Sequence, residues 1–155
     1  MLMVDVPLAV LGQMLNLNVF AAYLAAQGAV RAMIKAASGG VIINVTSQMG
    51  HVISPGRTVY CMTKHALERL TKAMAVELAP HNIRVNSVAP TFIETPMTAS
   101  MLAKPEFRNF VDDMITLGRI GKPDDVAAAV VYLASPAANM VTGTSLLIDG
   151  GWIAR

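Results

Sequence analysis

Hydrophobic positions in the first third of this chain follow the pattern of a long helix and then of a buried strand. Apolar residues dominate from residue 8 to about residue 35, and no charged side chain occurs in residues 6–30. The breaker Ser38-Gly39-Gly40 predicts the end of that helix. The β-branched run at residues 41–45 predicts a central parallel strand, because such strands are apolar on both faces.

The rest of the chain continues this alternation. Residues 60–78 place apolar side chains at helical spacing and predict a second long helix. Residues 89–120 form an irregular, partly helical stretch rich in Met and Phe, which we interpret as a lid or a partner surface. The remaining predicted elements are a strand at 83–88, a helix at 123–134 and a strand at 145–148. Alternating strands and helices predict an α/β fold with a parallel sheet.

Composition narrows the class of protein. The 155 residues suit one domain, and 54% hydrophobic with 14% charged residues excludes a disordered chain. The net charge of +2 comes from scattered Lys and Arg, so we expect no nucleic-acid partner. The single cysteine, Cys61, has no partner for a disulfide, and no His/Cys cluster has metal-ligand spacing. We therefore expect no metal site and a reducing, cytoplasmic location.

The uncharged stretch at residues 6–30 also raises the possibility of a membrane span. It contains Pro7 and several amides, among them Asn18, which are costly in hydrocarbon. The segment before it carries Asp5 and lacks the basic flank of a signal peptide. We favour a helix buried on most sides by protein, and no membrane partner.

Tyr60 and Lys64 form the first candidate for chemistry. They stand at i and i+4, so on a helix they lie on one face with Cβ atoms about 5–6 Å apart. A phenol has a reference pKa of about 10, and a neighbouring ammonium favours the phenolate. The pair could therefore act as an acid/base unit. Taken alone, it is better explained by Tyr60 covering apolar surface and Lys64 lying in solvent.

Ser47 and Asn18 are the next candidates. Ser47 directly follows the predicted strand at 41–45, and α/β proteins build their sites at the carboxyl ends of parallel strands. An ordinary turn or capping serine is the alternative. Asn18 lies within an apolar helix, where an unpaired buried amide costs about 1–3 kcal/mol. It must have a partner, either structural or catalytic.

These residues occur within longer blocks of sequence that point to a family. The blocks include "NVFAAY", "GGVIINVTSQMG", "YCMTKHALERLTKAMAVELAPHNIRVNSVAP", "FIETPM", "GRIGKPDDVAAAVVYLAS" and "VTGTSLLIDGG". In order and spacing they resemble the short-chain dehydrogenase/reductase family over nearly the whole chain. The resemblance implies a Rossmann-type, doubly wound parallel sheet. It extends to 3-oxoacyl reductases and to sugar or polyol dehydrogenases, and it does not separate them.

The same resemblance implies a role for each candidate. Tyr60 would be the general acid/base, and Lys64 would lower its pKa and hold the cofactor ribose. Ser47 would stabilise the substrate oxygen, and Asn18 would hold the water of a proton relay to Lys64. A hydride would then pass between the nicotinamide of NAD or NADP and a small-molecule carbonyl or alcohol substrate.

A further segment resembles the family's contact with the nicotinamide. Pro90, Ile93 and Thr95 match it, and so join Tyr60 and Lys64 as expected cofactor-binding residues. The family usually has glycine after this proline, whereas this chain has Thr91. A β-branched residue disfavours positive φ, so the sequence does not establish whether this loop follows the family's path over the nicotinamide.

The family's glycine-rich phosphate turn, GxxxGxG, does not occur in these 155 residues. Gly39-Gly40 ends a predicted helix and Gly150-Gly151 follows a strand, so neither opens a phosphate site. By resemblance, residues 1–155 form a single partial domain, the C-terminal catalytic part of the fold without its N-terminal βαβ half. We therefore expect the polypeptide alone to show neither saturable cofactor binding nor activity.

Two functions from different classes remain open on the sequence alone. One is an NAD(P)-dependent oxidoreductase that carries the Asn18, Ser47, Tyr60 and Lys64 set. The other is a non-catalytic, truncated relative that acts as an oligomerisation module. In that alternative the helices would associate with an intact relative. The uncharged helix at residues 6–30 and the apolar helix at residues 127–133 predict a homo-oligomer, most simply a symmetric dimer or tetramer.

Overall fold

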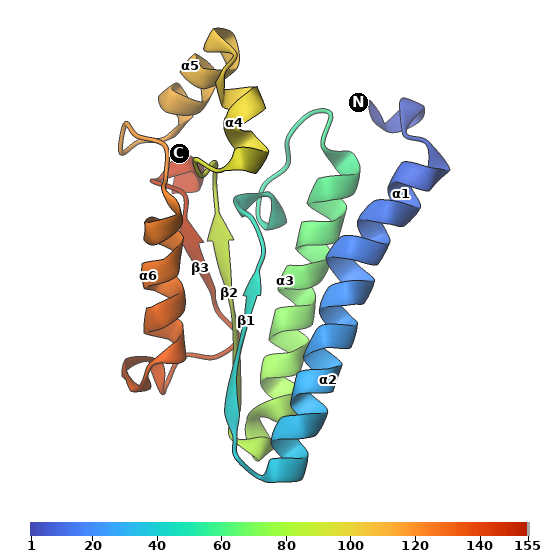
Figure 1. Cartoon of the computed structure of the whole chain (residues 1–155), viewed down its shortest axis with the longest axis vertical. Helices are drawn as coiled ribbons and strands as arrows, with labels where there is room; N and C mark the ends of the chain where they lie inside the picture. Colours follow the sequence, from blue (N-terminus) through green and yellow to red (C-terminus); the bar gives the residue numbers. More distant parts are fainter. Residues whose placement is uncertain (155) are drawn as a thin grey trace.

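A parallel sheet of three strands forms the centre of the molecule (Figure 1). The computed structural model describes residues 1–154. Strands β1 (Gly40–Val45), β2 (Ile83–Pro90) and β3 (Ser145–Ile148) lie in the order β1-β2-β3. Helices α1, α2 and α3 cover one face of the sheet and α6 covers the other. This arrangement confirms the expected α/β class with a Rossmann-like parallel sheet.

Strand β2 is the core of this sheet. It pairs with β1 from Gly40↔Ile83 to Val45↔Val88, and with β3 from Ser87↔Ser145 to Pro90↔Ile148. Because helices cover both faces, the β2 side chains are almost wholly buried. Asn86 is among them, and its amide bonds to the Val141 carbonyl (2.8 Å) and the Thr144 N–H (3.1 Å). The three carboxyl ends therefore meet at one edge, where α/β proteins place their sites.

The N-terminal helix has an interruption that the apolar pattern did not predict. Helix α1 (Leu8–Leu15) continues into α2 (Ala21–Ala36) through a π-helical turn, η2 (Asn16–Phe20). The helix ends where Ala37 adopts left-handed backbone angles, followed by Gly39 at φ +61°. A Cβ at Gly39 would lie 2.8 Å from the Asn82 carbonyl oxygen, so this close crossing requires glycine.

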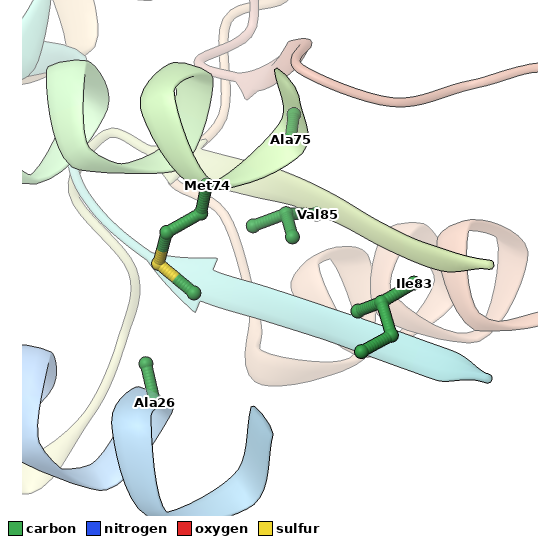
Figure 2. Packing of buried hydrophobic residues seen from close by; sticks show 5 residues of the cluster. All are labelled: Ala26, Met74, Ala75, Ile83 and Val85. Atoms are coloured by element: carbon green, nitrogen blue, oxygen red, sulfur yellow. The ribbon is translucent and has the colours of Figure 1, made fainter. Parts of the chain in front are cut away.

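Helices α2 and α3 (Thr58–Leu78) pack on the sheet through a small apolar cluster (Figure 2). Ala26 of α2 and Met74 of α3 face Ile83 and Val85 of β2. The outer face of the N-terminal helix is open, with Leu24 63% exposed. The expectation of a helix buried on most sides was wrong within residues 1–154, because only α3 and the sheet cover it.

Among the described residues, one helix, Leu8–Ala36, is long and apolar enough to cross a membrane. Its mean hydropathy is 1.5. The same two properties describe a helix that packs in the core of a soluble protein. The fold places one face of this helix against α3 and the sheet. Length and hydropathy alone therefore do not assign it to a bilayer.

Helix α6 (Pro123–Ala134) covers the opposite face and begins as the sequence predicts. Pro123 occupies its first turn, and the Asp125 carboxylate accepts from the Lys122 N–H at 2.7 Å. Arg119 forms a two-pronged pair with the same carboxylate, at 2.7 and 2.8 Å. This pairing holds the pKa of Asp125 well below its ordinary value.

Two short helices, α4 (Pro96–Leu102) and α5 (Pro105–Met114), stand above the carboxyl edge of the sheet (Figure 1). They form a second apolar cluster in which Val111 and Ile115 pack with Trp152. Phe92 joins it, with ring centroids 5.7 Å from Trp152. Short 3-10 turns complete the chain: Met3–Asp5, Gln48–Gly50, Ala79–His81, Pro136–Ala138 and Trp152–Ala154.

Candidate active site

Ser47 lies two residues after the end of β1, at the carboxyl edge of the sheet. The Thr46 N–H continues the ladder to the Val88 carbonyl at 2.8 Å, and the chain then turns into the 3-10 segment η3 (Gln48–Gly50). The Ser47 oxygen accepts from the Met49 N–H at 3.2 Å. Ser47 is therefore a capping serine, as the alternative reading supposed. Within residues 1–154 its hydroxyl donates to no other group, which leaves its proton for a ligand.

Tyr60 and Lys64 lie in the first two turns of α3, as the i,i+4 spacing predicted. The Lys64 ammonium is 5.7 Å from the centroid of the Tyr60 ring. It also donates to the Val45 carbonyl at 3.2 Å, which brings it to the strand that leads into Ser47. Burial lowers the pKa of Lys64, and the negative charge of Glu68 partly opposes that shift. The ammonium therefore gives up its proton more readily than a lysine in water.

Asn18 lies in the π-helical turn and points its amide toward α3. Its Nδ2 donates to the Thr63 hydroxyl at 3.0 Å, and that hydroxyl donates to the Tyr60 carbonyl at 2.8 Å. The expected partner of the amide thus exists, and it leads to the backbone of Tyr60. Single π-helical turns occur frequently at functional sites, which agrees with this position. The role of Asn18 in a water relay stays a prediction.

The residues expected to contact nicotinamide follow β2 directly. Pro90 is the last residue of that strand, Ile93 forms a bridge with Gly121, and Thr95 caps α4. Each has a structural role, and whether they also bind cofactor is untested. All three lie on the segment that leaves the carboxyl edge of the sheet, beneath α4 (Figure 1).

Thr91 does not impose the strain that its residue type suggested. Its φ is negative, since Ala37 and Asn82 are the described non-glycine residues with positive φ. Its N–H donates to the Ile148 carbonyl at 3.1 Å, which extends the β2–β3 pairing. The loop therefore leaves β2 without the positive φ that would favour glycine at this position.

Two buried oxygens at this edge have no hydrogen-bond partner within residues 1–154. They are Thr91 Oγ1 and Gln48 Oε1. An unpaired buried polar atom costs about 1–3 kcal/mol, and a bound molecule that offered hydrogen bonds would remove that cost. Ser47 and Lys64 add a hydroxyl and an ammonium at the same edge, so the described residues offer hydrogen-bonding groups of the kind that a nicotinamide and its ribose require.

The described residues offer no site that matches the pyrophosphate of such a cofactor. A helix N-terminus binds phosphate when a glycine-rich turn lets backbone N–H groups approach it. Helices α4, α5 and α6 instead begin with proline. The fit of residues 1–154 to NAD(P) therefore covers the nicotinamide and ribose alone.

Beside Tyr60, the structure shows a groove that sequence patterns did not predict. It lies between the N-terminal segment and the start of α3, and it is lined mainly by apolar residues that include Met1, Val6, Val10, Met14 and Val59. Residues far apart in sequence form it, so no local motif signals it. Sequence reasoning also missed Glu68, a buried carboxylate one turn after Lys64. Its only signal is an acidic residue beside the apolar Leu67 on the inward side of the helix.

Comparisons with known proteins identify the family of this chain. The family model described as enoyl-(acyl carrier protein) reductase matches residues 2–153. L-xylulose reductase of Bos taurus is 40% identical over 139 residues, which make up 90% of this chain and 57% of that protein. The chain thus spans somewhat more than half of the length of this relative.

Solved structures give the same picture. A short-chain type dehydrogenase/reductase from Mycobacterium marinum superposes with a TM-score of 0.94 at 40% identity, covering 100% of this chain and 61% of that one. Gluconate 5-dehydrogenase from Burkholderia cenocepacia J2315, solved with NADP and tartrate, gives a TM-score of 0.96 at 28% identity, covering 100% and 60%. Because the family model matches residues 2–153 and these structures share the fold at up to 40% identity, the chain belongs to the short-chain dehydrogenase/reductase family.

Proposed function

We propose that this chain carries the catalytic residues of an NAD(P)-dependent oxidoreductase that interconverts a carbonyl and a secondary alcohol. One observation carries the proposal. The Lys64 ammonium lies 5.7 Å from the Tyr60 ring and is hydrogen-bonded to the strand that ends beside Ser47. A proton donor, a cation and a free hydroxyl thus lie at one edge of a parallel sheet.

The chain's own groups divide the work of proton transfer. The Ser47 hydroxyl donates a hydrogen bond to the substrate oxygen, and the Tyr60 phenol gives that oxygen a proton during reduction and takes it back during oxidation. The Lys64 ammonium stabilises the negative charge that develops on the Tyr60 oxygen. Bound NAD or NADP supplies or accepts the hydride. Lys64 can then recover or release a proton through water, for which Asn18 is the proposed holder.

The substrate is proposed to be a small molecule with a carbonyl or secondary alcohol group. One of the two relatives above is named as a reductase of L-xylulose, and the other as a dehydrogenase of gluconate. The matching family model is named for an enoyl-(acyl carrier protein) reductase. The groove beside Tyr60 is mainly apolar, with Arg57 at its edge. The names of the two relatives support a carbonyl or alcohol substrate, and the described residues favour neither NAD nor NADP.

The proposal places the protein in the cytoplasm as a homo-oligomer. Cys61 is a buried free thiol, which suits a reducing compartment. The open apolar face of α1 and α2 supports association with a second copy. Such association fits the alternative, a non-catalytic interaction module, equally well. The retained site residues are the reason that we propose the enzyme.

Replacing Tyr60 tests the proposal. Tyr60→Phe removes the proton donor and keeps the ring, so kcat should fall by at least about 10²-fold while cofactor affinity changes little. The assay follows nicotinamide absorbance with a panel of ketoses, oxoacids and oxoacyl thioesters. The protein is assayed together with a polypeptide that supplies the glycine-rich phosphate turn. Tyr132→Phe, on α6, is the matched control and should keep full turnover. Near-normal turnover of Tyr60→Phe on an accepted substrate would show that the assigned role is wrong.

A further inference from the structure

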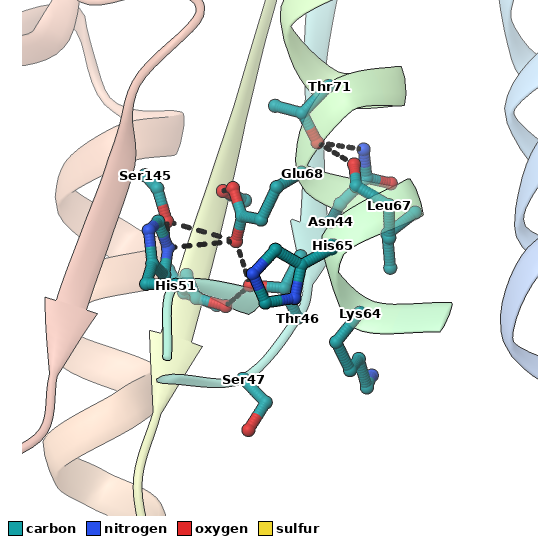
Figure 3. Close-up of polar contacts among 12 residues, drawn as sticks. Asn44, Thr46, Ser47, His51, Lys64, His65, Leu67, Glu68, Thr71 and Ser145 are labelled. Carbon is teal, nitrogen blue, oxygen red and sulfur yellow. Dashed lines mark hydrogen bonds and ion pairs between the residues drawn. The ribbon is translucent and has the colours of Figure 1, made fainter. Parts of the chain in front are cut away.

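Glu68 is a carboxylate inside the molecule that the proposed reaction does not use. It lies on α3, four residues after Lys64 and eight after Tyr60, and is 5% exposed. Carboxylates are almost never this buried unless they are paired. Figure 3 shows Glu68 directed from α3 toward the sheet, with Ser47 and Lys64 together on one side of it. Its partners explain what it does.

Hydroxyls from all three strands of the sheet converge on this carboxylate. The Thr46 hydroxyl, directly after β1, donates to Oε1. The Ser145 hydroxyl of β3 donates to the same oxygen at 3.0 Å, and the Ser87 hydroxyl of β2 donates to Oε2 at 2.8 Å. A carboxylate accepts up to about four hydrogen bonds, so these three hydroxyls use most of its accepting capacity. One side chain therefore joins helix α3 to every strand.

His51 connects the same group to the far end of the loop that contains Ser47. Its Nε2 lies 2.8 Å from the Ser145 oxygen and 3.3 Å from Glu68 Oε1. Because the Ser145 hydroxyl donates its proton to Glu68, its oxygen accepts from His51 Nε2–H. Thr46 and His51 bracket residues 47–50, and both are bonded to the Glu68 group. The loop with Ser47 is thus held at its two ends by one carboxylate.

Gly50 gives an independent sign that this loop is fitted against α3. A Cβ at Gly50 would lie 2.9 Å from Glu68 Cγ and 3.0 Å from the Lys64 carbonyl oxygen. Its φ is not positive, so it is the close approach that requires glycine. The loop backbone therefore touches the helix at the turn between Lys64 and Glu68. Glu68 is thus one of the groups that the loop packs against.

We propose that Glu68 is a positioning residue, which fixes the Ser47 hydroxyl relative to Tyr60 and Lys64; this inference rests on the proposed function. Tyr60, Lys64 and Glu68 belong to one rigid helix, whereas Ser47 lies on a loop. The Glu68 carboxylate holds that loop in a fixed position relative to helix α3. Misplacing a reacting group by about 1 Å can cost about 10²-fold in rate, so such a connection matters for catalysis.

The first test measures the loop without any activity. Glu68→Gln keeps the shape of the side chain but replaces one accepting oxygen by a donor, so hydroxyl partners lose an acceptor. Amide hydrogen exchange at Gly50 and His51, whose N–H groups donate to Ser47 O and Gln48 O at 2.8 Å, should become at least about tenfold faster. Exchange at Val85 and Val88 in β2 should not change. Glu77→Gln, an exposed position on the same helix, is the matched control and should leave all four amides unaffected.

The opposite results would overturn the proposal. Unchanged exchange at Gly50 and His51 would mean that Glu68 does not hold the loop, and an equal rise across β2 would mean that it only holds the fold. If Glu68→Gln fails to fold, His51→Ala provides the second variant, since it removes one attachment and leaves the three hydroxyl bonds of Glu68 in place. It should accelerate exchange at Gly50 by a smaller factor.

Kinetics then separates this proposal from the proposed function. In the active protein Glu68→Gln should lower kcat by about 10²-fold and leave KM for the cofactor within about twofold, because it misplaces a group without removing a cofactor contact. Wild-type kcat in Glu68→Gln, with Tyr60→Phe inactive, would refute the positioning role alone. Full activity of Tyr60→Phe would refute the proposed function, while the exchange result would still decide whether Glu68 holds the loop.

Discussion

The amide of Asn18 donates to the hydroxyl of Thr63 at 3.0 Å, across 45 positions of sequence. Thr63 is fully buried, and its hydroxyl donates a hydrogen bond to the Tyr60 carbonyl oxygen at 2.8 Å. The interrupted N-terminal helix is therefore joined to the turn of α3 that begins with Tyr60. This chain of two hydrogen bonds connects the Asn18 side chain to the backbone of Tyr60, a second predicted site residue.

Replacing Thr63 should show the strength of that link. Thr63→Val keeps the shape but removes the hydroxyl that accepts from Asn18, and because Asn18 is only half-buried the free energy of unfolding should fall by about 0.5–1.5 kcal/mol. Urea unfolding measures this change. Thr63→Ser restores the hydroxyl and should recover more than half of the loss. Equal stabilities of the Val and wild-type proteins would contradict the role given to this bond.

Lys64 should make the stability of the protein depend on alkaline pH. Its folded pKa lies below the ordinary 10.5 because burial penalises the charged form. The unfolded chain therefore binds more protons in the window between the two pKa values, and stability rises with pH across that window. Below it the cost of the buried charge is fully present.

Lys64→Met removes that cost. We expect the variant to unfold at higher urea concentration than wild type at neutral pH, with the gap closing as pH approaches 10.5. The same variant should lose activity, a trade-off common at functional sites. Lys72→Met, at an exposed position of the same helix, is the control and should show no such pH-dependent gap. A gap that stays constant with pH would mean that burial of the ammonium is not its cause.

The open face of α1 and α2 should mediate self-association. Leu17, Phe20 and Leu24 are 73%, 56% and 63% exposed there, and a groove between α2 and α3 lies beside them. Soluble monomers rarely expose apolar patches of more than a few hundred Å², so we expect a symmetric dimer or tetramer. Leu24→Glu should convert it to monomers in light scattering at micromolar concentration. Met140→Glu is the control, because Met140 is also apolar and exposed but lies away from this face, and it should leave the oligomer intact. A monomeric wild-type protein would contradict the prediction.

The sequence determined most of the fold, because its signals are local. The predicted strands at 41–45, 83–88 and 145–148 and the helix at 123–134 all agree with the observed elements to within two residues. Periodicity, glycine breakers and proline at a helix start act over a few neighbouring residues, so one chain suffices to read them. The i,i+4 pair of Tyr60 and Lys64 is of the same kind, since a helix alone places both on one face.

Only the tertiary structure decided the features that depend on contacts between residues distant in sequence. The π-helical turn at Asn18, the exposed face of its helix and the negative φ of Thr91 depend on neighbours that no local pattern specifies. Glu68 is the clearest example of a residue whose environment only the fold determines. In sequence it is one acid on a long helix, and only the parallel pairing of three strands brings Thr46, Ser87 and Ser145 to it. A buried charge is tolerable only where such partners converge, and convergence is a property of the folded chain.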